Sequence, residues 1–432
     1  ASPFDAGTAY AAIDRHRLDD FAPYIYVTHD YGKHWNRGDR GIDSLAYVQV
    51  VRSDLTRKGL LYAGTETGVY VSFDDGGHWQ SLQLNLPAAS VRDLAVHDND
   101  LVAATHGRAF WVLDNLTPLQ QLDESVLRED AHLFLPERAV RIRRSENRDT
   151  PLPPEEPLGT NPPSGAIIDY YLRNKPRTPI SLEIVDEAGN LVRKFQSTDE
   201  PDPSTGPQYF MDAWLPKTRP LSTERGHNRF VWDLRYTSPP TKQRDYSMAA
   251  IVGQGTENQP QGPLVLPGKY RLTLNVGGKQ YVQTLTVEMD PRVSLPVSSL
   301  KGQLSLAVDV WNAQSDQFAL REAADSLHSQ LAAVANNPGT DPKYRQAALS
   351  LIKNTTALND SLSDNGLSGL ETTIMSADRE PTQQMREAFE FLNARLSNSK
   401  NLWETIKKDL TESAFSGIKV PVVPMRHIDF VR

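Results

Sequence analysis

Two aligned stretches near the start of the chain decide how its first 120 residues fold. They are Tyr24-Ile25-Tyr26-Val27-Thr28-His29-Asp30-Tyr31-Gly32-Lys33-His34-Trp35 and, without gaps, Gly68-Val69-Tyr70-Val71-Ser72-Phe73-Asp74-Asp75-Gly76-Gly77-His78-Trp79. Position 68 aligns with position 24, an offset of 44 residues. A weaker third copy repeats Leu61–Thr65 and Tyr70-Val71 as Leu101–Thr105 and Phe110-Trp111, at an offset of 40 residues. A period of about 40–45 residues with several short strands is typical of propeller blades.

The two complete copies share the pattern Ser/Thr-x-Asp-x-Gly-x-x-Trp, and each position has a physical reason in a hairpin turn. The Asp accepts hydrogen bonds from turn amides, the Gly adopts a positive φ, and the Trp returns over the turn to fill space between sheets. In the third copy Asn115 and Leu116 follow Asp114, with no Gly or Trp in place. We predict structural roles for Thr28, Asp30, Gly32, Trp35, Ser72, Asp74, Gly76 and Trp79.

This pattern resembles the Asp-box, or BNR, repeat of bacterial sialidases, sortilin-like proteins and xyloglucan-cleaving propeller hydrolases. The resemblance covers residues 1–120 and implies a partial β-propeller of about three blades. Propellers close with typically 4–8 blades, so we expect the remaining blades to come from an upstream precursor or from another chain. In this family the Asp boxes lie in peripheral hairpin turns, which favours a structural role for Asp30 and Asp74 over a catalytic one.

The second and third repeats differ in a turn between strands. Thr65-Glu66-Thr67-Gly68 in the second repeat corresponds to Thr105-His106-Gly107-Arg108 in the third. Glu66, His106 and Arg108 are candidates for lining a central channel, and the alternative is an ordinary turn with a capping His. The other acidic residues near the blade mouths, which spacing does not distinguish, are Asp39, Asp43 and Asp93.

Residues 121–164 are predicted to be a proline-rich connector, because six prolines fall between Pro151 and Pro163 and stiffen an extended chain. From residue 165 the strand pattern resumes. Its clearest part is a hairpin in which alternating apolar residues flank the turn Gly277-Gly278. About six or seven short strands over residues 165–292 fit an immunoglobulin-like β-sandwich.

Three stretches of this region carry a second resemblance: Gly165-Ala166, Asn228–Tyr236 and Pro267–Tyr270. They resemble the C-terminal region of large bacterial exported proteins that pair a sortilin-like propeller with an Ig-like domain. The resemblance implies that this chain is the C-terminal part of such a protein. Trp232 and Asp233 are candidates for sugar stacking and a polar sugar contact, and a core Trp on a central strand is the favoured alternative.

After residue 292 the apolar spacing becomes helical, with steps of three and four residues. We predict two long amphipathic helices and a shorter one at about residues 342–361, packed as an antiparallel bundle over residues 293–416 and followed by a tail at 417–432. An oligomerisation seam is the alternative use of the apolar stripe. Ser298 is expected to cap the first helix and Pro381 to lie in the first turn of the last. The fold class is therefore mainly β with an α-helical C-terminal region.

The chain carries 46 basic and 54 acidic residues, a net charge of −8, and no cysteine. The acidic balance argues against a general nucleic-acid partner, and no apolar run approaches the ~20 residues of a membrane helix. The lack of cysteine excludes disulfides and thiolate zinc sites. No signal peptide is visible at Ala1, so we expect a signal upstream of it and a secreted or periplasmic protein.

The chain contains no Gly-x-Ser-x-Gly, no His-Glu-x-x-His and no Walker loop, and we predict no metal site and no cofactor. Catalytic residues are unknown from the sequence, because the carboxylate pairs that cleave glycosides come from distant blades. Two hypotheses follow. The first is a protein-, peptide- or glycan-binding module without its own catalytic centre. The alternative is part of a sialidase- or xyloglucanase-like glycoside hydrolase whose active site is completed by missing N-terminal blades.

Overall fold

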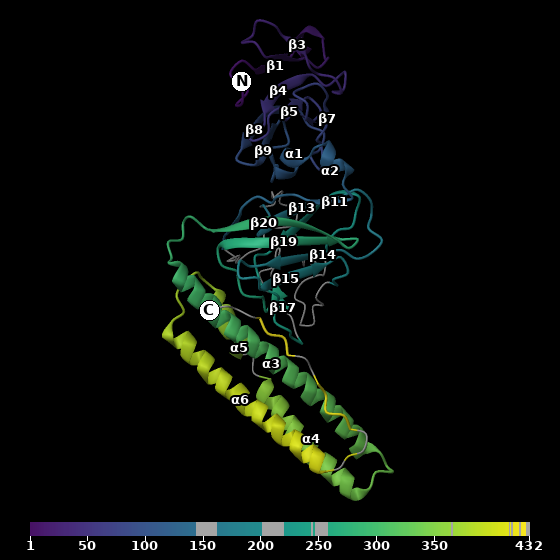
Figure 1. Cartoon of the computed structure of the whole chain (residues 1–432), viewed down its shortest axis with the longest axis vertical. Helices are drawn as coiled ribbons and strands as arrows, with labels where there is room; N and C mark the ends of the chain where they lie inside the picture. The colour runs from purple at the N-terminus through teal and green to yellow at the C-terminus, as the bar shows by residue number, and fades with distance from the viewer. Residues whose placement is uncertain are drawn as a thin grey trace. The chain divides into compact units, whose positions relative to one another are not determined.

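The computed structural model describes residues 1–143, 162–200, 220–242, 245–246, 258–363, 366–413, 415, 418–422 and 425–428. The chain forms two compact units, Ala1–Glu137 and Arg138–Arg432, called the N-terminal unit and the C-terminal unit below. Figure 1 shows strands in both units and long helices toward the end of the chain. The protein is therefore a mixed β and α structure with several antiparallel sheets and C-terminal helices.

Three antiparallel sheets, each built from consecutive strands, make up most of the N-terminal unit. The first contains β1 (Ala9–Ala12), β2 (Ile25–Thr28) and β3 (Asn36–Arg37). The second contains β4 (Val48–Ser53), β5 (Leu61–Thr65), β6 (Val69–Ser72) and β7 (Gln80–Ser81). The third contains β8 (Val91–His97), β9 (Asp100–Thr105) and β10 (Phe110–Leu113). The remaining elements are η1 (His16–Leu18), α1 (Thr117–Gln121), α2 (Glu124–Arg128) and β11 (Ala131–Leu133).

The second sheet is covered on both faces, and all 5 residues of β5 are buried. Leu61 and Ala63 belong to an apolar cluster with Ile25 of the first sheet. Tyr62 belongs to a separate cluster with Leu101 of the third sheet. Successive strand residues point to opposite faces, so a strand that is apolar at nearly every position needs a neighbouring sheet on each side.

The two Asp boxes form the same turn, one between β2 and β3 and one between β6 and β7. In the second box, Ser72 Oγ accepts a hydrogen bond from the Gly76 amide at 3.0 Å, and Asp74 Oδ1 accepts one from the His78 amide at 2.8 Å. The φ of Gly76 is 89°, in the left-handed region that favours glycine. The first box repeats this geometry with Thr28, Asp30, Gly32 and His34.

The tryptophans that end the two boxes have different surroundings. Trp79 is 4% exposed, and its indole N–H donates to the Gly38 carbonyl at 2.9 Å in the segment that follows the first sheet. Trp35 is 44% exposed, and its indole donates only to the Gly32 carbonyl of its own turn, at 3.1 Å. Among the described residues of the N-terminal unit, no sheet precedes the first one, so Trp35 has no equivalent surface to cover.

Because Trp79 fills the space between two sheets, Trp79→Ala is expected to destabilise the N-terminal unit by about 3–5 kcal/mol. Trp35→Ala, the matched control, is expected to cost less than about 1 kcal/mol because its ring is partly in solvent. Hydrogen exchange of the β2 and β5 amides measures both. Equal losses of protection in the two variants would contradict the role assigned to Trp79.

The C-terminal unit begins with two layers of strands. A five-stranded sheet has the order β12 (Ala139–Arg141), β20 (Lys279–Met289), β19 (Gly268–Val276), β14 (Ser181–Val185) and β15 (Leu191–Gln196). β13 (Ala166–Leu172) pairs antiparallel with β16 (Gly226–Trp232), and the short β17 (Asp245–Tyr246) pairs with β18 (Asn258–Gln259). β19 and β20 join through the predicted Gly277-Gly278 turn, with Val276 opposite Lys279.

Trp232 is a core residue between these layers. It is fully buried, its ring meets that of Tyr270 at a centroid distance of 5.5 Å, and its indole donates to the Arg235 carbonyl at 3.0 Å. Because Trp232 lies on β16 and Tyr270 on β19, the β13–β16 pair packs against the five-stranded sheet. A buried ring has no face left for a sugar, so the sugar-stacking interpretation of Trp232 is wrong.

In the described residues after 292, four helices follow where the sequence predicted three. They are α3 (Val297–Asn336), α4 (Pro342–Leu362), α5 (Gly366–Met375) and α6 (Gln383–Glu412). All four contribute to one apolar core, and α4 returns alongside α3 (Figure 1). The short α5 was not predicted, although Leu367, Leu370 and Ile374 follow a helical spacing of three and four residues.

Two expectations about helix ends were wrong. Ser298 lies inside the first turn of α3, whose N-cap is Pro296 and has no side-chain cap. Pro381 precedes the N-cap of α6, which is Thr382; its side chain accepts a hydrogen bond from the Met385 amide. In both cases the helix begins one or two residues away from the position that residue preference alone suggests.

The segment predicted as a connector is partly folded. Residues 121–143 contain α2, β11 and β12. The Asp123 carboxylate caps α2 by accepting hydrogen bonds from the Ser125 and Val126 amides. Most of the predicted proline-rich run, residues 151–161, lies outside the described residues, as do parts of residues 237–262 and of the predicted tail at 417–432.

A buried carboxyl group lies in the helical core. Glu371 of α5 is 3% exposed, and its Oε2 accepts a hydrogen bond from Gln314 Nε2 of α3 at 2.7 Å. Burial raises the pKa of Glu371 to about 7, and the Gln314 bond and the charge of Arg235 oppose this only in part. The group is therefore protonated in the folded protein under mildly acidic conditions.

This raised pKa makes the stability of the C-terminal unit depend on pH. The unfolded Glu ionises near 4.5, so the folded state holds an extra proton between about pH 4.5 and 7, and stability falls as the pH rises through that range. Glu371→Gln should raise the free energy of unfolding by about 2–3 kcal/mol at pH 8 and change it little at pH 4.5. Thermal unfolding at the two pH values tests this, and an equal effect at both would contradict it.

Candidate functional site

A polar cluster lies at the end of the sheets opposite the Asp boxes. β6 runs from Val69 to Ser72, so the turn that contains Glu66 precedes it and the box turn follows it. The ends of three segments meet at the Glu66 end: the residues before β4, the β5–β6 turn and the residues before β8. This end is the candidate site because it gathers ionisable and hydroxyl side chains from two sheets.

The Glu66 carboxylate is the centre of the cluster. Its Oε2 accepts hydrogen bonds of 2.6 Å from the Tyr47 hydroxyl and 2.6 Å from the Ser90 hydroxyl. Gln49 Nε2 lies at 3.5 Å and Arg92 Nη2 at 3.9 Å from the same oxygen. The Glu66 side chain remains 36% exposed, so the carboxylate is anchored and still accessible from solvent.

These contacts hold Glu66 in its ionised form. Burial by itself would raise the pKa of Glu66, but the Ser90 and Tyr47 hydrogen bonds and the charge of Arg92 outweigh it, and the pKa is lowered. For the partner hydroxyl, burial and the bond to Glu66 raise the pKa of Tyr47 to about 12. The site therefore presents a carboxylate anion beside a neutral phenol at neutral pH.

Aromatic rings border the carboxylate. The His16 ring stacks on Tyr47 with 4.7 Å between centroids and a 21° interplanar angle, and Phe21 lies 6.1 Å from Tyr47. His16 Nδ1 is 2.6 Å from Asp14 Oδ1. A flat aromatic surface beside an anion can contact both the apolar face and the hydrogen-bond donors of a ligand.

Of the predicted channel-lining residues, Glu66 is the centre of the cluster, and His106 lies next to it through its backbone with an exposed side chain. The His106 amide donates to the Ser90 carbonyl at 2.8 Å, and Ser90 in turn contacts Glu66. Arg108 is placed differently from the sequence alignment. The Thr65 amide donates to the Gly68 carbonyl, but the Thr105 amide donates to that of Ala109.

The third turn is thus one residue longer, and Ala109 rather than Arg108 corresponds to Gly68. The Arg108 carbonyl accepts from the Trp111 indole at 2.9 Å, and its side chain is exposed. In the described part of the chain, no contact joins the Arg108 side chain to the Glu66 cluster.

The other acidic candidates stand apart from this cluster. Asp39 pairs with Arg37 and Asp93 with Arg52, each at 2.6 Å. The Asp43 carboxylate accepts from the Leu45 amide at 2.8 Å. Each carboxylate is therefore engaged in a local contact.

The box aspartates lie at the far end of the sheets. Hydrogen bonds from the His34 amide and ring lower the pKa of Asp30 to about 2. The pKa of Asp74 is also lowered: burial would raise it, but the His78 and Ser72 bonds outweigh that effect. Carboxyl groups of this kind stay ionised, which suits a turn anchor and not a proton donor.

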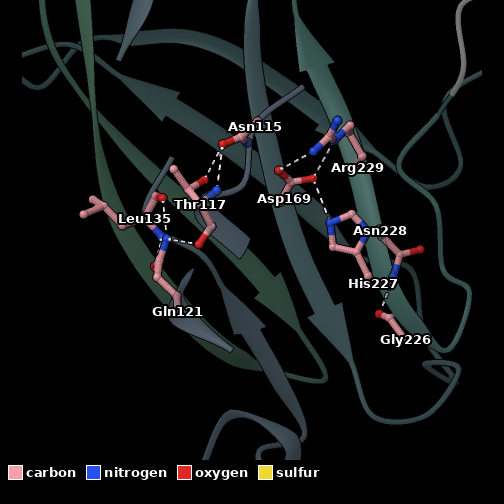
Figure 2. Close-up of polar contacts among 9 residues, drawn as sticks. All are labelled: Asn115, Thr117, Gln121, Leu135, Asp169, Gly226, His227, Asn228 and Arg229. Carbon is pink, nitrogen blue, oxygen red and sulfur yellow. Dashed lines mark hydrogen bonds and ion pairs between the residues drawn. The ribbon is translucent and has the colours of Figure 1, made fainter. Parts of the chain in front are cut away.

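A second polar cluster lies in the C-terminal unit (Figure 2). Asp169 of β13 is 2% exposed, and its Oδ1 is 2.9 Å from both His227 Nε2 and Arg229 Nε of β16. Asp169 and Arg229 are directly opposite in the strand register. The same view shows the Asn228 side-chain amide donating to the Gly226 carbonyl at 3.0 Å. This arrangement is a cross-strand ion pair that fixes the register.

Within the described residues, no three His, Asp or Glu side chains are grouped so that they could hold a metal ion. The same part of the chain has no helix with the length and apolar character needed to cross a membrane.

Comparisons with known proteins identify no family. No protein-family model matches the chain, and no curated protein matches it. Among solved structures, the chain is similar to YCF48 bound to a D1 peptide, with 19% identity over 21% of this chain and 30% of that chain and a TM-score of 0.18. It is also similar to an ancestral GH74 enzyme, with 15% identity over 65% of this chain and 34% of that chain and a TM-score of 0.21.

The chain spans about a third of the length of each of these structures. Both TM-scores are too low to establish a shared fold, so neither similarity contributes to the functional argument.

The sequence pointed to Glu66 but not to its partners. Tyr47, Ser90 and Arg92 lie 19, 24 and 26 positions from it, and no motif joins them. The only available signal was indirect: each lies just before or at the start of a strand, where the repeat brings chain segments to the same sheet end.

Replacing one hydroxyl donor tests how Glu66 is held. Ser90→Ala should raise the pKa of Glu66 toward its ordinary value, because one of two short hydrogen bonds to the anion is lost. Carbon-13 NMR titration of the glutamate carboxyls measures the change, with Ser81→Ala on exposed β7 as the control. The wild-type contribution of Glu66 to stability is present above about pH 4.5 and lost as the pH falls below it. An unchanged Glu66 titration in Ser90→Ala would contradict this assignment.

Proposed function

We propose that the N-terminal unit is part of an Asp-box β-propeller that acts as a binding module, with the Glu66 cluster as its ligand surface. Three consecutive antiparallel sheets at a spacing of 40 to 44 residues, each packed on the next through apolar clusters, support the propeller assignment. The remaining blades are supplied from outside these residues. The two-layered strands of the C-terminal unit are proposed to be an Ig-like sandwich, and the protein to be exported.

The observation that carries the binding proposal is the anchored, accessible anion. Glu66 is fixed by Tyr47 and Ser90 through one oxygen, Oε2, and its side chain is partly exposed. A carboxylate fixed in this way can accept hydrogen bonds from the hydroxyl groups of a glycan or from the N–H and cationic groups of a peptide. The partly exposed His16 ring and the exposed Phe21 ring, which pack on the buried Tyr47, add an apolar contact surface.

The chemistry of Glu66 favours binding over hydrolysis. A general acid for glycoside cleavage needs a raised pKa and a second carboxylate at a distance of about 5–10 Å. The pKa of Glu66 is lowered, so this carboxyl group does not meet the first of these two requirements. The alternative is a glycoside hydrolase completed by further blades. It predicts cleavage of a glycan, with catalytic groups supplied by those blades.

Binding assays on the full chain test the proposal. The probes are xyloglucan oligosaccharides, sialyllactose and a pool of Lys- and Arg-containing peptides, each measured by calorimetry. For whichever probe binds the wild-type chain, Glu66→Gln should weaken binding by about 10–100-fold, since it removes a charge-assisted hydrogen bond. The matched control is Glu124→Gln, whose side chain is 85% exposed on α2.

Equal binding by Glu66→Gln and the wild-type chain would overturn the assignment of the surface. Release of monosaccharide or sialic acid from the glycan probes would favour the hydrolase alternative.

A further inference from the structure

The third sheet lacks the outer strand that the first two sheets have. β3 lies on the outer edge of β2, and β7 on the outer edge of β6, each reached through an Asp-box turn. After β10 the chain lacks a box and turns at Asn115, whose φ is 62°. It then enters α1 instead of returning along the sheet. Within the described residues, β10 therefore pairs only with β9.

The turn away from β10 is held by specific contacts. The Asn115 side chain accepts hydrogen bonds from the Thr117 amide and hydroxyl, and Gln121 exchanges two hydrogen bonds with the Leu135 backbone (Figure 2). Arg57, between β4 and β5, donates to the carbonyl of Leu119 at 2.8 Å. These contacts keep residues 115–122 away from the position that β7 occupies in the second sheet.

The second sheet shows how a strand pairs with the edge that corresponds to the free edge of β10. There, Tyr70 and Val71 of β6 pair with Ser81 and Gln80 of β7, and the Leu82 amide donates to the Val69 carbonyl at 2.8 Å. The matched turns place Phe110 where Val69 lies, because Gly68 corresponds to Ala109. Strand residues alternate between edges, so the Phe110 and Val112 backbones face the unpaired edge.

The side chains at this edge are apolar and exposed. Phe110 is 75% exposed and Val112 52% exposed, while the equivalent Val69 and Val71 are 3% and 2% exposed because the third sheet packs over them. Phe110 lies opposite Ala104, and Val112 opposite Val102, on one sheet face. An unpaired edge beside exposed apolar side chains is a template for strand addition.

We propose that the outer edge of β10 binds an extended polypeptide strand from outside these 432 residues, in the antiparallel register that β7 takes on β6. The strand donates an amide to the Phe110 carbonyl and places an apolar side chain beside Phe110, as Leu82 lies beside Val69 in the second sheet. This rests on the repeat of sheets and is independent of the ligand proposed for the Glu66 surface. The observed β6–β7 pairing is the model for the bound strand, and this favours a strand that resembles β7. A second copy of this chain would instead offer its own β10, which follows no box turn.

The probe is a synthetic peptide with the sequence of residues 77–84, which contains β7 and Leu82. Amide hydrogen exchange of residues 108–114 is followed in the full chain with the peptide at about 1 mM. Exchange should slow at least about tenfold at Phe110 and Val112 and stay unchanged in β8. The control peptide carries Leu82→Pro, which removes the donating N–H, and should give no protection.

A chain variant, Phe110→Asp, should lose the peptide effect while its β8 amides exchange as in the wild-type chain. If that variant fails to fold, the comparison of the two peptides still decides the question. No protection by the first peptide, or equal protection by both, would overturn the proposal. Protection that rises with the concentration of the chain alone, with a dimer in light scattering, would overturn it in favour of a second copy.

Discussion

The second sheet of the N-terminal unit has apolar side chains on both faces, and the rest of that unit depends on this two-sided burial. Val71 and Tyr62 face the third sheet, while Leu61 and Ala63 face the first. Burying such side chains contributes about 25 cal/mol per Å² of apolar surface, which no isolated sheet can gain. The sheets are therefore stable only as a stack, and Trp79 secures it by bonding back to the segment after the first sheet.

Stacking also explains where the polar cluster forms. Because each sheet repeats the same path, corresponding strand ends come together at one end of the stack, and the box turns come together at the other. The Glu66 carboxylate then meets hydroxyls from Tyr47, before β4, and from Ser90, before β8. The cluster is a consequence of the repeat, and its chemistry comes from the particular residues at those ends.

In the C-terminal unit, unlike the partly exposed Glu66 cluster, an ion pair is buried. Arg141 of β12 is 3% exposed and pairs with Asp378, after α5, at 2.8 Å. Burial lowers the pKa of Arg141 to about 10, and the nearby Asp378 opposes this effect. The strand layer and the helices are thus tied by an ion pair that is costly to break, since removing one partner leaves the other charge buried. Glu371, by contrast, is buried among the helices with no ion-pair partner in the described part of the chain, and burial raises its pKa.

The sequence by itself determined the repeat, the two box turns, the β19–β20 hairpin and the helical C-terminal region. These are local properties: period-two alternation, glycine at positive φ and apolar steps of three and four. It could not determine the one-residue longer turn after Thr105 or the starting residues of α3 and α6, because small shifts in register carry no compositional signal. The short α5 was missed. It singled out Glu66 and His106 but not Tyr47, Ser90 or Arg92. Only tertiary structure could bring those together, because stacking joins strand ends that lie far apart in the chain.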